Sequence, residues 1–475
     1  MKALLINPPI NNFDFTRSAN FPLGIAYIAN VFKKQKCHVE VLDILAEGLN
    51  QKQVEKFIRN NRFDIIGITG LISVFSYLSW LSEIIKKYHP DTLSLFGGSL
   101  ATSAPKIILE NSKIDFLVLG EGETTIKEII ESKKRNGNIK KIAGIAYKES
   151  SGEIIINKNR KRIQSLDTIG FPAWELFDTK KYIRTNPPLL DYKWKYKKRW
   201  INIISSRGCP YGCIFCGKTF GQETRLRSAN NIILEIKQLI KKFNIEHLNF
   251  CDDFFAVDRN RVLKICEGMM NLEKKITWTA SVRVDSVDDE LLKIMKKANC
   301  MGFCLGVESG SQKILDNIQK FTKVEIAEKA VRVTKKNKLF SHCSIMIGSP
   351  EETMGTIEET KNFLKRLDIF PLPINFITPV PGSKLYNYAK EKGLIKDEIE
   401  YLKKLDFAFF KKPAVNLTEL SSEQLVYLKR KTEKELRIRY IIKHPFWAAK
   451  RLLFHFMYYG IKTSIRKLKL SILHK

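Results

Sequence analysis

The sequence has no long apolar run, no export signal and no internal repeat. None of its apolar stretches reaches the roughly 18–20 residues that a membrane-spanning helix needs. The opening stretch MKALLINPPI is interrupted by Pro8 and Pro9 too early for a secretory signal. General disorder is also excluded, because 44% of the 475 residues are apolar and 28% are charged. We therefore expect a cytoplasmic, globular chain of two or three domains.

Acidic residues are scarce. The chain has 81 lysines and arginines against 50 acidic residues, which gives a net charge of +31. Residues 429–475 hold 14 of these basic residues and two acidic ones, so about +12 of the excess lies there. Acidic or membrane-surface partners are thus to be considered. The alternative is a solvated tail in a lysine-rich protein.

The nine cysteines do not indicate a disulfide framework, since no export signal precedes them. Three of them form a motif that is described below. The other six are scattered among apolar residues, and we expect buried small hydrophobic side chains at Cys37, Cys251, Cys266, Cys300, Cys304 and Cys343.

Residues 1–134 alternate between strand and helix patterns. The expected strands are 2–7, 39–43, 64–69, 92–96 and 115–119, and the expected helices are 23–35, 51–60, 76–88, 105–111 and 124–134. This order predicts an α/β fold with a doubly wound parallel sheet, which binds ligands at the carboxyl ends of its strands. Residues 135–198, with a hairpin at 142–156, are interpreted as a connector.

A second alternation fills residues 199–390. Its expected strands are 201–205, 247–251, 276–281, 302–307, 341–347 and 374–377, with helices between them. Six such units predict a partial or full β/α barrel whose site lies at the carboxyl ends of the strands. Residues 391–475 are expected to be a helical, basic C-terminal region.

Cys209, Cys213 and Cys216 form a CxxxCxxC motif directly after the first expected barrel strand. Three thiolates at this spacing can bind three irons of a 4Fe–4S cluster and leave the fourth iron open. A structural zinc site would normally need four ligands. No nearby Cys or His offers the fourth, so the motif favours the cluster.

Here the sequence resembles the radical S-adenosylmethionine (SAM) enzymes. The resemblance implies that the open iron chelates SAM and that reduction cleaves SAM to a 5′-deoxyadenosyl radical, with a flavodoxin- or ferredoxin-type protein as the reductant. It also implies SAM contacts at the ends of the following strands. The matching residues are Asp252, Asp253, Ser281, Arg283, Glu308 and Gly348.

Residues 1–134 resemble the cobalamin-binding domain that precedes many radical SAM barrels. The resemblance rests on Thr69-Gly70-Leu71, on Gly97-Gly98 and on the segment FLVLGEGE that ends at Glu123. It implies that cobalamin is a cofactor and that its contacts lie at Thr69, Leu71, Gly97, Gly98, Gly120, Glu121, Gly122 and Glu123. Small residues at the glycine pair would let the nucleotide tail of cobalamin pass between sheet and helices.

One feature departs from the classical cobalamin domain. That domain supplies an axial His from the loop after its first strand, but the loop from Pro8 to Gly24 contains no His. Any cobalamin bound here should therefore be base-off without a His ligand. The alternative is a flavodoxin-like domain that binds no ligand.

Together the resemblance covers about residues 1–390 and implies a cobalamin-binding radical SAM enzyme. The expected reaction is methylation or rearrangement of an unactivated carbon, with coupling or cyclisation without methyl transfer as the alternative. The basic and aromatic tail suggests a lipid or isoprenoid-derived substrate, reached by peripheral membrane contact. A helix packed across the barrel is the other interpretation of this tail.

Two other classes of protein are less well supported. A methylthiotransferase-like enzyme that acts on tRNA would explain the positive charge. Such relatives end in a small β-barrel, whereas this C-terminal region is expected to be helical, so nucleic acid is not an expected partner. A non-catalytic cobalamin-binding protein would not need the CxxxCxxC motif.

Overall fold

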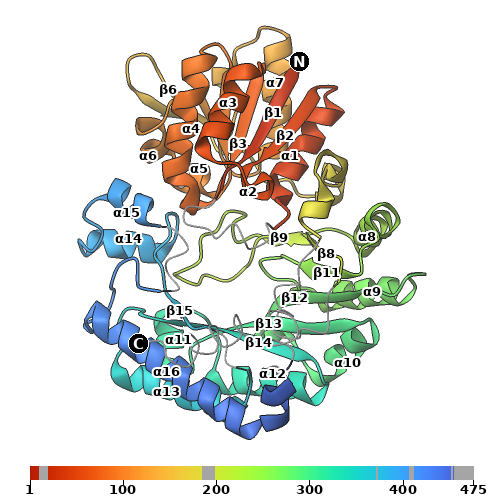
Figure 1. The fold of residues 1–475 in the computed structure, drawn as a ribbon, viewed down its shortest axis with the longest axis vertical. Coiled ribbons are helices and arrows are strands. Elements are labelled where there is room, and N and C mark those ends of the chain that lie inside the picture. The colour runs from red at the N-terminus through yellow and green to blue at the C-terminus, as the bar shows by residue number, and fades with distance from the viewer. Residues whose placement is uncertain (10–19, 184–197, 371–372, 406–410, 451–452, 454–475) are drawn as a thin grey trace.

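The computed structural model describes residues 1–9, 20–183, 198–370, 373–405, 411–450 and Leu453. It shows two α/β lobes, drawn one above the other in Figure 1. The sequence-based expectation of an α/β fold with a parallel N-terminal sheet, a partial barrel and a helical C-terminal region is confirmed.

The N-terminal lobe contains a seven-stranded sheet of order β2-β1-β3-β4-β5-β6-β7. Its strands are β1 (Lys2–Asn7), β2 (His38–Asp43), β3 (Ile65–Thr69), β4 (Leu93–Gly97), β5 (Phe116–Val118), β6 (Ile145–Lys148) and β7 (Ile154–Ile156). The first five strands run parallel, and the hairpin β6–β7 adds to the edge antiparallel. Part of the expected connector therefore extends this sheet.

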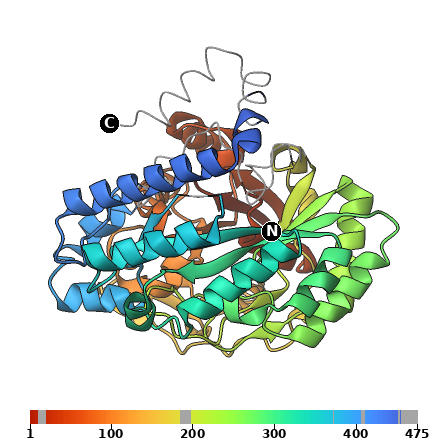
Figure 2. The same cartoon turned by 90° about the horizontal axis from the view of Figure 1, so that it is seen from below.

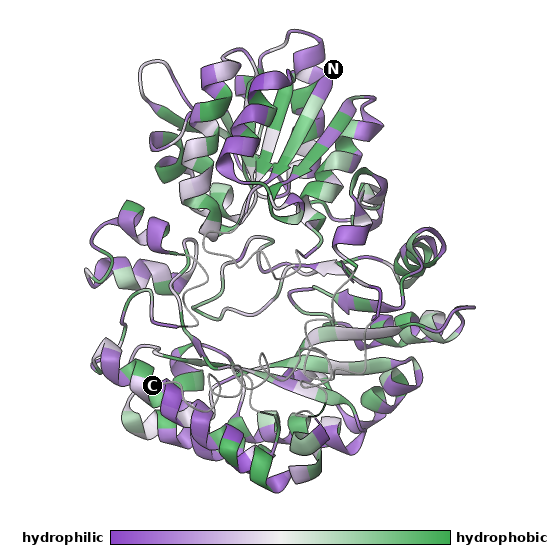
Figure 3. Cartoon of the chain, in the orientation of Figure 1, coloured by the Kyte–Doolittle hydropathy of each residue, from purple (hydrophilic) through white to green (hydrophobic). Residues whose placement is uncertain are grey.

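Helices cover both faces of the N-terminal sheet. One face carries α1 (Leu23–Lys34) and α7 (Gly122–Lys134), and the other carries α3 (Gln51–Asn60), α4 (Phe75–Tyr88) and α6 (Pro105–Glu110). Successive strand residues serve opposite faces. Leu5 packs in the core with α1, whereas Leu4 and Ile6 pack in the core with α3 and α4. Figure 3 shows the hydrophobic strands enclosed by helices with hydrophilic outer faces.

The second lobe is an open half-barrel of six parallel strands, in the order β15-β14-β13-β12-β11-β8. The strands are β8 (Trp200–Ile203), β11 (His247–Phe250), β12 (Thr277–Arg283), β13 (Cys300–Glu308), β14 (Phe340–Ile347) and β15 (Asn375–Phe376). All six expected strands are present, and no strand end differs from its expected position by more than two residues. The barrel is partial because β8 and β15 do not pair with each other.

Helices wrap the outside of this open sheet, as Figure 2 shows. They are α8 (Ala229–Phe243), α9 (Arg259–Met270), α10 (Asp289–Lys297), α11 (Gln312–Asn317), α12 (Val324–Lys336) and α13 (Met354–Leu367). Side chains such as Trp278 and Phe303 are completely buried between strands and helices. The inner side and the carboxyl ends of the strands are thus left for ligands.

The C-terminal region is helical, as expected. Helix α14 (Lys384–Glu391) is followed by α15 (Glu398–Lys404), which packs on α4 of the N-terminal lobe, and by α16 (Ser422–Lys443), which packs on α13. Leu425 and Leu436 of α16 are buried. The expected packing of a helix against the barrel therefore describes α16, and most of the tail after it lies outside the described residues. Among the helices that the structure describes, none is long and apolar enough to cross a membrane.

Candidate functional site

The three cysteines of the CxxxCxxC motif lie on one loop, residues 208–224, which we call the cluster loop. It leaves the half-barrel after β9 (Ser206–Arg207) and returns through β10 (Arg225–Leu226), and these two strands pair antiparallel. At Gly208 the φ angle is +88°, and a Cβ there would come within 2.2 Å of the carbonyl oxygen of Glu223. Only glycine fits this position, so the loop begins in a tight neck.

The three thiols lie close enough to influence one another. Cys213 is buried, Cys209 is half-buried and Cys216 is exposed. Part of Cys216 is accessible, but the surrounding protein still shields its thiol from water. This desolvation, and then the charges of Asp253, Cys213 and Cys209, raise the pKa of Cys216 to about 11. Burial also raises the pKa of Cys213, while the nearby cations Lys320 and Arg283 act in the opposite direction. The positive charges of Lys320 and Arg283 can therefore stabilise thiolates in this loop.

Three thiols on one loop are a suitable donor set for a 4Fe–4S cluster. In the ranges that the structure describes, no three Cys, His, Asp or Glu side chains form a site for one ion. A 4Fe–4S cluster binds each cysteine through a different iron, so its ligands stand farther apart than those around one ion. Three thiols without a fourth ligand also do not complete a structural zinc site.

The structure brings the six predicted SAM residues to the same edge of the half-barrel as the cluster loop. Each lies at or just beyond the carboxyl end of β11, β12, β13 or β14. Ser281 and Asp253 are exposed. Arg283 is buried, pairs with Asp285 at 2.9 Å and donates to the carbonyl oxygen of Lys320. These side chains can surround a small ligand next to the three thiols.

Asp252 is already fully engaged within the protein. Its carboxylate accepts hydrogen bonds from the backbone N–H and the hydroxyl of both Ser205 and Ser206. Burial raises its pKa, against which Arg261 and these serines act. Asp252 therefore positions the strand end before the cluster loop. Its neighbour Asp253 accepts from the N–H of Gly208 at 3.1 Å and leaves the rest of its carboxylate accessible.

Glu308 lies in a left-handed conformation with a φ of +72° at the end of β13. Its carboxylate pairs with Lys320 at 2.7 Å and accepts from the hydroxyl of Ser344 at 3.0 Å. Lys320 belongs to no motif and follows the short helix α11, so sequence reasoning missed it. Its only sequence signal was a lysine between apolar segments, which is common on protein surfaces.

Gly348 also needs a left-handed backbone, with a φ of +89°. Its N–H donates to Glu352 at 2.8 Å, and the N–H of Ser349 donates to the same carboxylate oxygen. Burial raises the pKa of Glu352 to about 7, although these hydrogen bonds lower it. Glu352 thus shapes the turn that holds Gly348.

One expectation about the cysteines is wrong. Cys251 is exposed at the end of β11, because its side chain follows the alternation of the strand toward the inner side of the half-barrel. Cys304 on β13 is half-buried for the same reason. Cys37, Cys266, Cys300 and Cys343 are buried as expected.

A cavity lies at the carboxyl edge of the N-terminal sheet, and its empty space, with the open solvent at its mouth included, is about 860 Å³. Both lobes line it: α1 and α7 on one side, and Ile204, Arg207, Thr219 and Phe220 of the half-barrel on the other. Of the eight predicted cobalamin residues, seven line it, namely Thr69, Gly97, Gly98, Gly120, Glu121, Gly122 and Glu123. Leu71 does not line it and is 58% exposed. The predicted cobalamin contacts thus converge on one cavity.

The cavity is shaped by glycines, which is the main argument that a large flat ligand fits there. A Cβ at Gly24 or Gly120 would meet no atom within 4 Å and would project into open space. At Gly98 the φ angle is +109°, and a Cβ would lie 2.7 Å from the carbonyl oxygen of Gly70. None of the described residues that line the cavity is His. Most of the loop from Pro8 to Gly24, on which the base-off expectation rests, lies outside the described residues.

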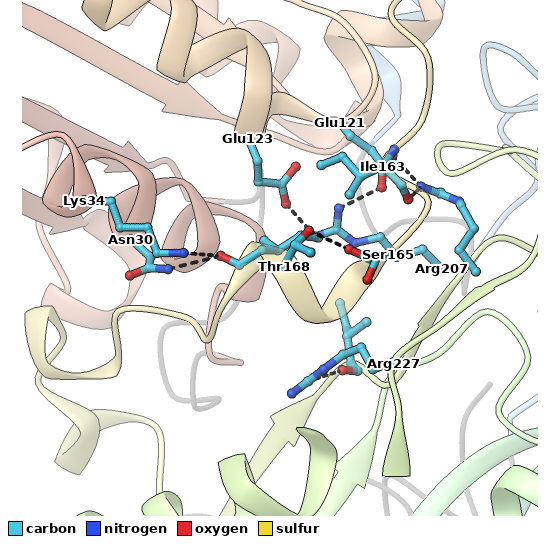
Figure 4. A network of polar contacts seen from close by, with 12 residues as sticks. Asn30, Lys34, Glu121, Glu123, Ile163, Ser165, Thr168, Arg207 and Arg227 are labelled. Carbon is cyan, nitrogen blue, oxygen red and sulfur yellow. Dashed lines mark hydrogen bonds and ion pairs between the residues drawn. The ribbon is translucent and has the colours of Figure 1, made fainter. Parts of the chain in front are cut away.

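Four buried charged residues join the cavity to the cluster loop, and we call them the interdomain clamp: Glu121, Glu123, Arg207 and Arg225. Arg207 donates to Glu121 at 2.8 Å and to Glu123 at 2.6 Å, and Arg225 donates to Glu121 at 2.5 Å. Figure 4 shows Glu121 and Glu123 with Ile163, whose N–H also donates to Glu121. Residues Gly120 to Glu123, which we call the GEGE segment, therefore bind the half-barrel through their two acidic side chains.

The side chains of the clamp attract one another strongly, because opposite charges are paired away from water. Burial opposes ionisation of Glu121, yet Arg207 and Arg225 hold the pKa of its carboxyl below the usual value. Removing one partner of such a buried pair leaves an uncompensated charge, at a cost of about 3–5 kcal/mol. Glu121 and Glu123, which the sequence predicts as cobalamin contacts, both line the cavity. Sequence reasoning did not find their arginine partners.

The fold and the site together define a two-lobed α/β protein in which a loop with three cysteines joins the wall of a glycine-lined cavity between the lobes. The sequence matches the Radical SAM superfamily over residues 203–364 and the B12 binding domain over residues 17–130. Both matches fall on the lobes described above.

Individual relatives agree. An uncharacterised methyltransferase of Pyrococcus horikoshii is 31% identical over 94% of this chain and 95% of its own. An anaerobic magnesium-protoporphyrin IX monomethyl ester cyclase of Rubrivivax gelatinosus is 26% identical over 84% of this chain and 72% of its own. The radical SAM methyltransferase TsrM of Kitasatospora setae shares the fold, with a TM-score of 0.69, 16% identity and coverage of 83% of this chain and 78% of its own.

This chain belongs to the cobalamin-binding radical SAM enzymes. Its cofactors are a 4Fe–4S cluster, SAM and cobalamin. Enzymes of this superfamily also require a reductant and a small-molecule substrate.

Proposed function

We propose that this protein methylates an unactivated carbon of a small molecule, with a second cosubstrate SAM as the source of the methyl group. The observation that carries this proposal is that one cavity is lined by both the GEGE segment and the cluster loop. When bound, the cluster and SAM supply a carbon radical that removes a hydrogen atom, and cobalamin supplies a methyl group. A cavity shared by the two lobes brings these two chemistries to one place.

The residues have separate tasks. Cys209, Cys213 and Cys216 hold the cluster, and Asp253, Ser281, Arg283, Glu308 and Gly348 surround SAM. Asp252 acts indirectly, through Ser205 and Ser206. Thr69, Gly97, Gly98, Gly120 and Gly122 form the cobalamin cavity, Glu121 and Glu123 fix its edge, and Leu71 lies outside the lining. Both carboxylates of the clamp are paired with arginines, so neither is free to act as a base.

Cyclisation without methyl transfer is the second candidate, because one relative is a cyclase. Methylation is favoured, since the relative that is 31% identical over almost its whole length bears the name of an uncharacterised methyltransferase. The two reactions differ in their consumption of SAM. Methylation produces both 5′-deoxyadenosine and S-adenosylhomocysteine, whereas cyclisation produces 5′-deoxyadenosine alone.

The test is anaerobic reconstitution with iron, sulfide and hydroxocobalamin, followed by desalting and an ultraviolet–visible spectrum. We expect a cluster band together with near-stoichiometric base-off corrinoid, and 5′-deoxyadenosine on reduction in the presence of SAM. Cys213→Ala should abolish the cluster band and SAM cleavage but keep the corrinoid. Cys37→Ala, which changes a buried thiol far from the loop, should keep all three. Retained SAM cleavage in Cys213→Ala would refute the assignment.

The substrate is proposed to be a lipid or an isoprenoid-derived molecule. Exposed apolar side chains gather at the end of α16 and just beyond it: Ile438, Ile441, Ile442, Phe446 and Leu453. Arg439, Lys443 and Lys450 alternate with them in the sequence. An apolar surface with a cationic border suits an anionic bilayer, and the protein carries a net charge of +31. The same charge favours an acidic flavodoxin- or ferredoxin-type reductant.

Cosedimentation with vesicles that contain anionic lipid tests the membrane contact. The double variant Ile442→Ser/Phe446→Ser should lose binding, because these side chains are 72% and 90% exposed. Tyr427→Ser is the control, since Tyr427 is also exposed on α16 but lies away from this surface in the sequence. Equal binding by the double variant and the wild type would refute the contact.

A further inference from the structure

The neck of the cluster loop is held by the N-terminal lobe. In the pairing of β9 with β10, Arg207 lies opposite Arg225. Like charges directly opposite on neighbouring strands repel each other. Glu121 removes this repulsion, because one of its carboxylate oxygens accepts from Arg207 and the other accepts from Arg225. The closure of the neck therefore depends on a residue from the other lobe.

The same residues form part of the cavity wall. Arg207, Glu121 and Glu123 all line the cavity. The guanidinium of Arg207 also lies between two rings, with its carbon 5.4 Å from the ring centroid of Tyr27 and 5.2 Å from that of Phe220. Tyr27 belongs to α1, whereas Phe220 belongs to the cluster loop. A ligand that fills the cavity thus meets the group that closes the neck.

Arg207 lies only two residues before the first cysteine of the motif. Arg207 and Cys209 are joined by Gly208, whose conformation leaves no room for a Cβ. The N–H of Cys209 donates to the carbonyl oxygen of Gly221 across the neck, at 3.2 Å. A displacement of Arg207 is therefore passed on to the position of Cys209.

We propose that the interdomain clamp couples the two cofactor sites, so that a corrinoid in the cavity and a cluster on the three cysteines each raise the affinity of the protein for the other. Arg207 and Arg225 are positioning residues in this coupling, and Glu121 is the group that joins them. The coupling is reciprocal by thermodynamic necessity. It rests on the proposed function only in that a corrinoid occupies the cavity.

Equilibrium titration with hydroxocobalamin tests the proposal without any measurement of activity. The full-length protein is titrated anaerobically in its cluster-free and its cluster-reconstituted forms, and the corrinoid spectrum gives Kd. For the wild type we expect Kd to be at least about fivefold lower in the reconstituted form. Glu121→Gln should bring the two Kd values together. Glu131→Gln changes a half-buried carboxylate of α7, the helix that begins directly after Glu121. This carboxylate pairs with Lys127, and the variant should keep the difference.

Each outcome decides the proposal. Equal Kd values for the two wild-type forms, or a difference that Glu121→Gln retains, would overturn it and leave the proposed function standing. Absence of corrinoid binding in both wild-type forms would overturn the proposal and the cobalamin part of the proposed function together. Should Glu121→Gln fail to fold, Arg225→Lys decides, because it keeps the charge but not the fork geometry. Full coupling in folded Arg225→Lys would also overturn the proposal.

Discussion

The guanidinium of Arg283 lies over the ring of Tyr211, with its central carbon 3.4 Å from the ring centroid. Arg283 ends β12, and Tyr211 lies in the cluster loop between Cys209 and Cys213. Asp285 and the carbonyl oxygen of Lys320 hold the guanidinium from other sides. The end of one barrel strand is thereby tied to the loop that carries the cysteines.

This contact predicts different effects for two changes of Tyr211. Tyr211→Leu removes the ring face and should lower the free energy of unfolding by about 1–2 kcal/mol, together with the iron content after reconstitution. Tyr211→Phe keeps the ring and should behave like the wild type. Anaerobic urea unfolding and iron analysis measure both effects. Equal losses in the two variants would show that the hydroxyl, and not the ring, is the important group.

Asp252 and Asp253 are neighbours in sequence but should respond differently to removal of their charge. Asp252→Asn disturbs a buried carboxylate that accepts from Ser205 and Ser206, so we expect a loss of about 1–3 kcal/mol in the free energy of unfolding. Asp253→Asn changes an exposed carboxylate and should weaken SAM binding with little change in stability.

Urea unfolding and isothermal titration with SAM distinguish these two roles. The pair is its own control, because the same chemical change is made one residue apart. A large loss of stability in Asp253→Asn, or unchanged stability in Asp252→Asn, would contradict the assignment.

Glu352 gives the protein a specific pH dependence. Its pKa is about 7 in the folded protein, against an ordinary value of 4.5, because burial disfavours the charged carboxylate. Between these values the folded state holds a proton that the unfolded chain has released. The stability from this group is therefore complete below pH 4.5 and is lost as the pH rises to 7, by about 3 kcal/mol.

Glu352→Gln should remove that dependence and keep the turn, because its amide oxygen can still accept from Gly348 and Ser349. Unfolding by urea at pH 5 and at pH 8 measures the difference. Relative to this variant, the wild type should lose stability on going to pH 8. Glu359→Gln alters an exposed carboxylate of α13 and should follow the wild type. Parallel behaviour of Glu352→Gln and the wild type would exclude Glu352 as the source.

The sequence was sufficient for the order of elements and for the edge at which the site lies. Strict alternation of strands and helices predicts parallel sheets, and the carboxyl ends of parallel strands necessarily share one edge. Local patterns were therefore enough to predict that the cysteines and the glycine turns lie at this edge. The placement of Leu71 could not be predicted in this way, because its position close to Thr69 in the sequence does not show that its side chain lies outside the cavity lining.

Contacts between residues that are distant in the chain could not be predicted from the sequence. Arg207 is 86 residues from Glu121, and Arg283 is 72 residues from Tyr211. No periodicity links such positions, since their contact depends on how two lobes or two loops pack. Cys251 illustrates the same limit within one strand: an apolar neighbourhood suggested burial, but the inner side of an open barrel is accessible.

Gly24 offers the most direct test of the cavity. It is the second residue of α1 and is exposed toward the cavity, where a Cβ would meet no atom within 4 Å. Gly24→Leu should therefore fold normally, because leucine is a better helix former than glycine and its Cβ would meet no atom within 4 Å. The added side chain would occupy space that a corrinoid needs. We expect the Kd for hydroxocobalamin to rise at least about tenfold, which corresponds to about 1.4 kcal/mol.

Gly355→Leu is the matched control, because Gly355 is the second residue of α13, is exposed and does not line the cavity. It should leave corrinoid binding unchanged. Circular dichroism establishes that both variants are folded, and the corrinoid spectrum after desalting gives the occupancy. Wild-type occupancy in Gly24→Leu would place the corrinoid elsewhere, because a leucine at this position cannot share the cavity with a ligand that fills it.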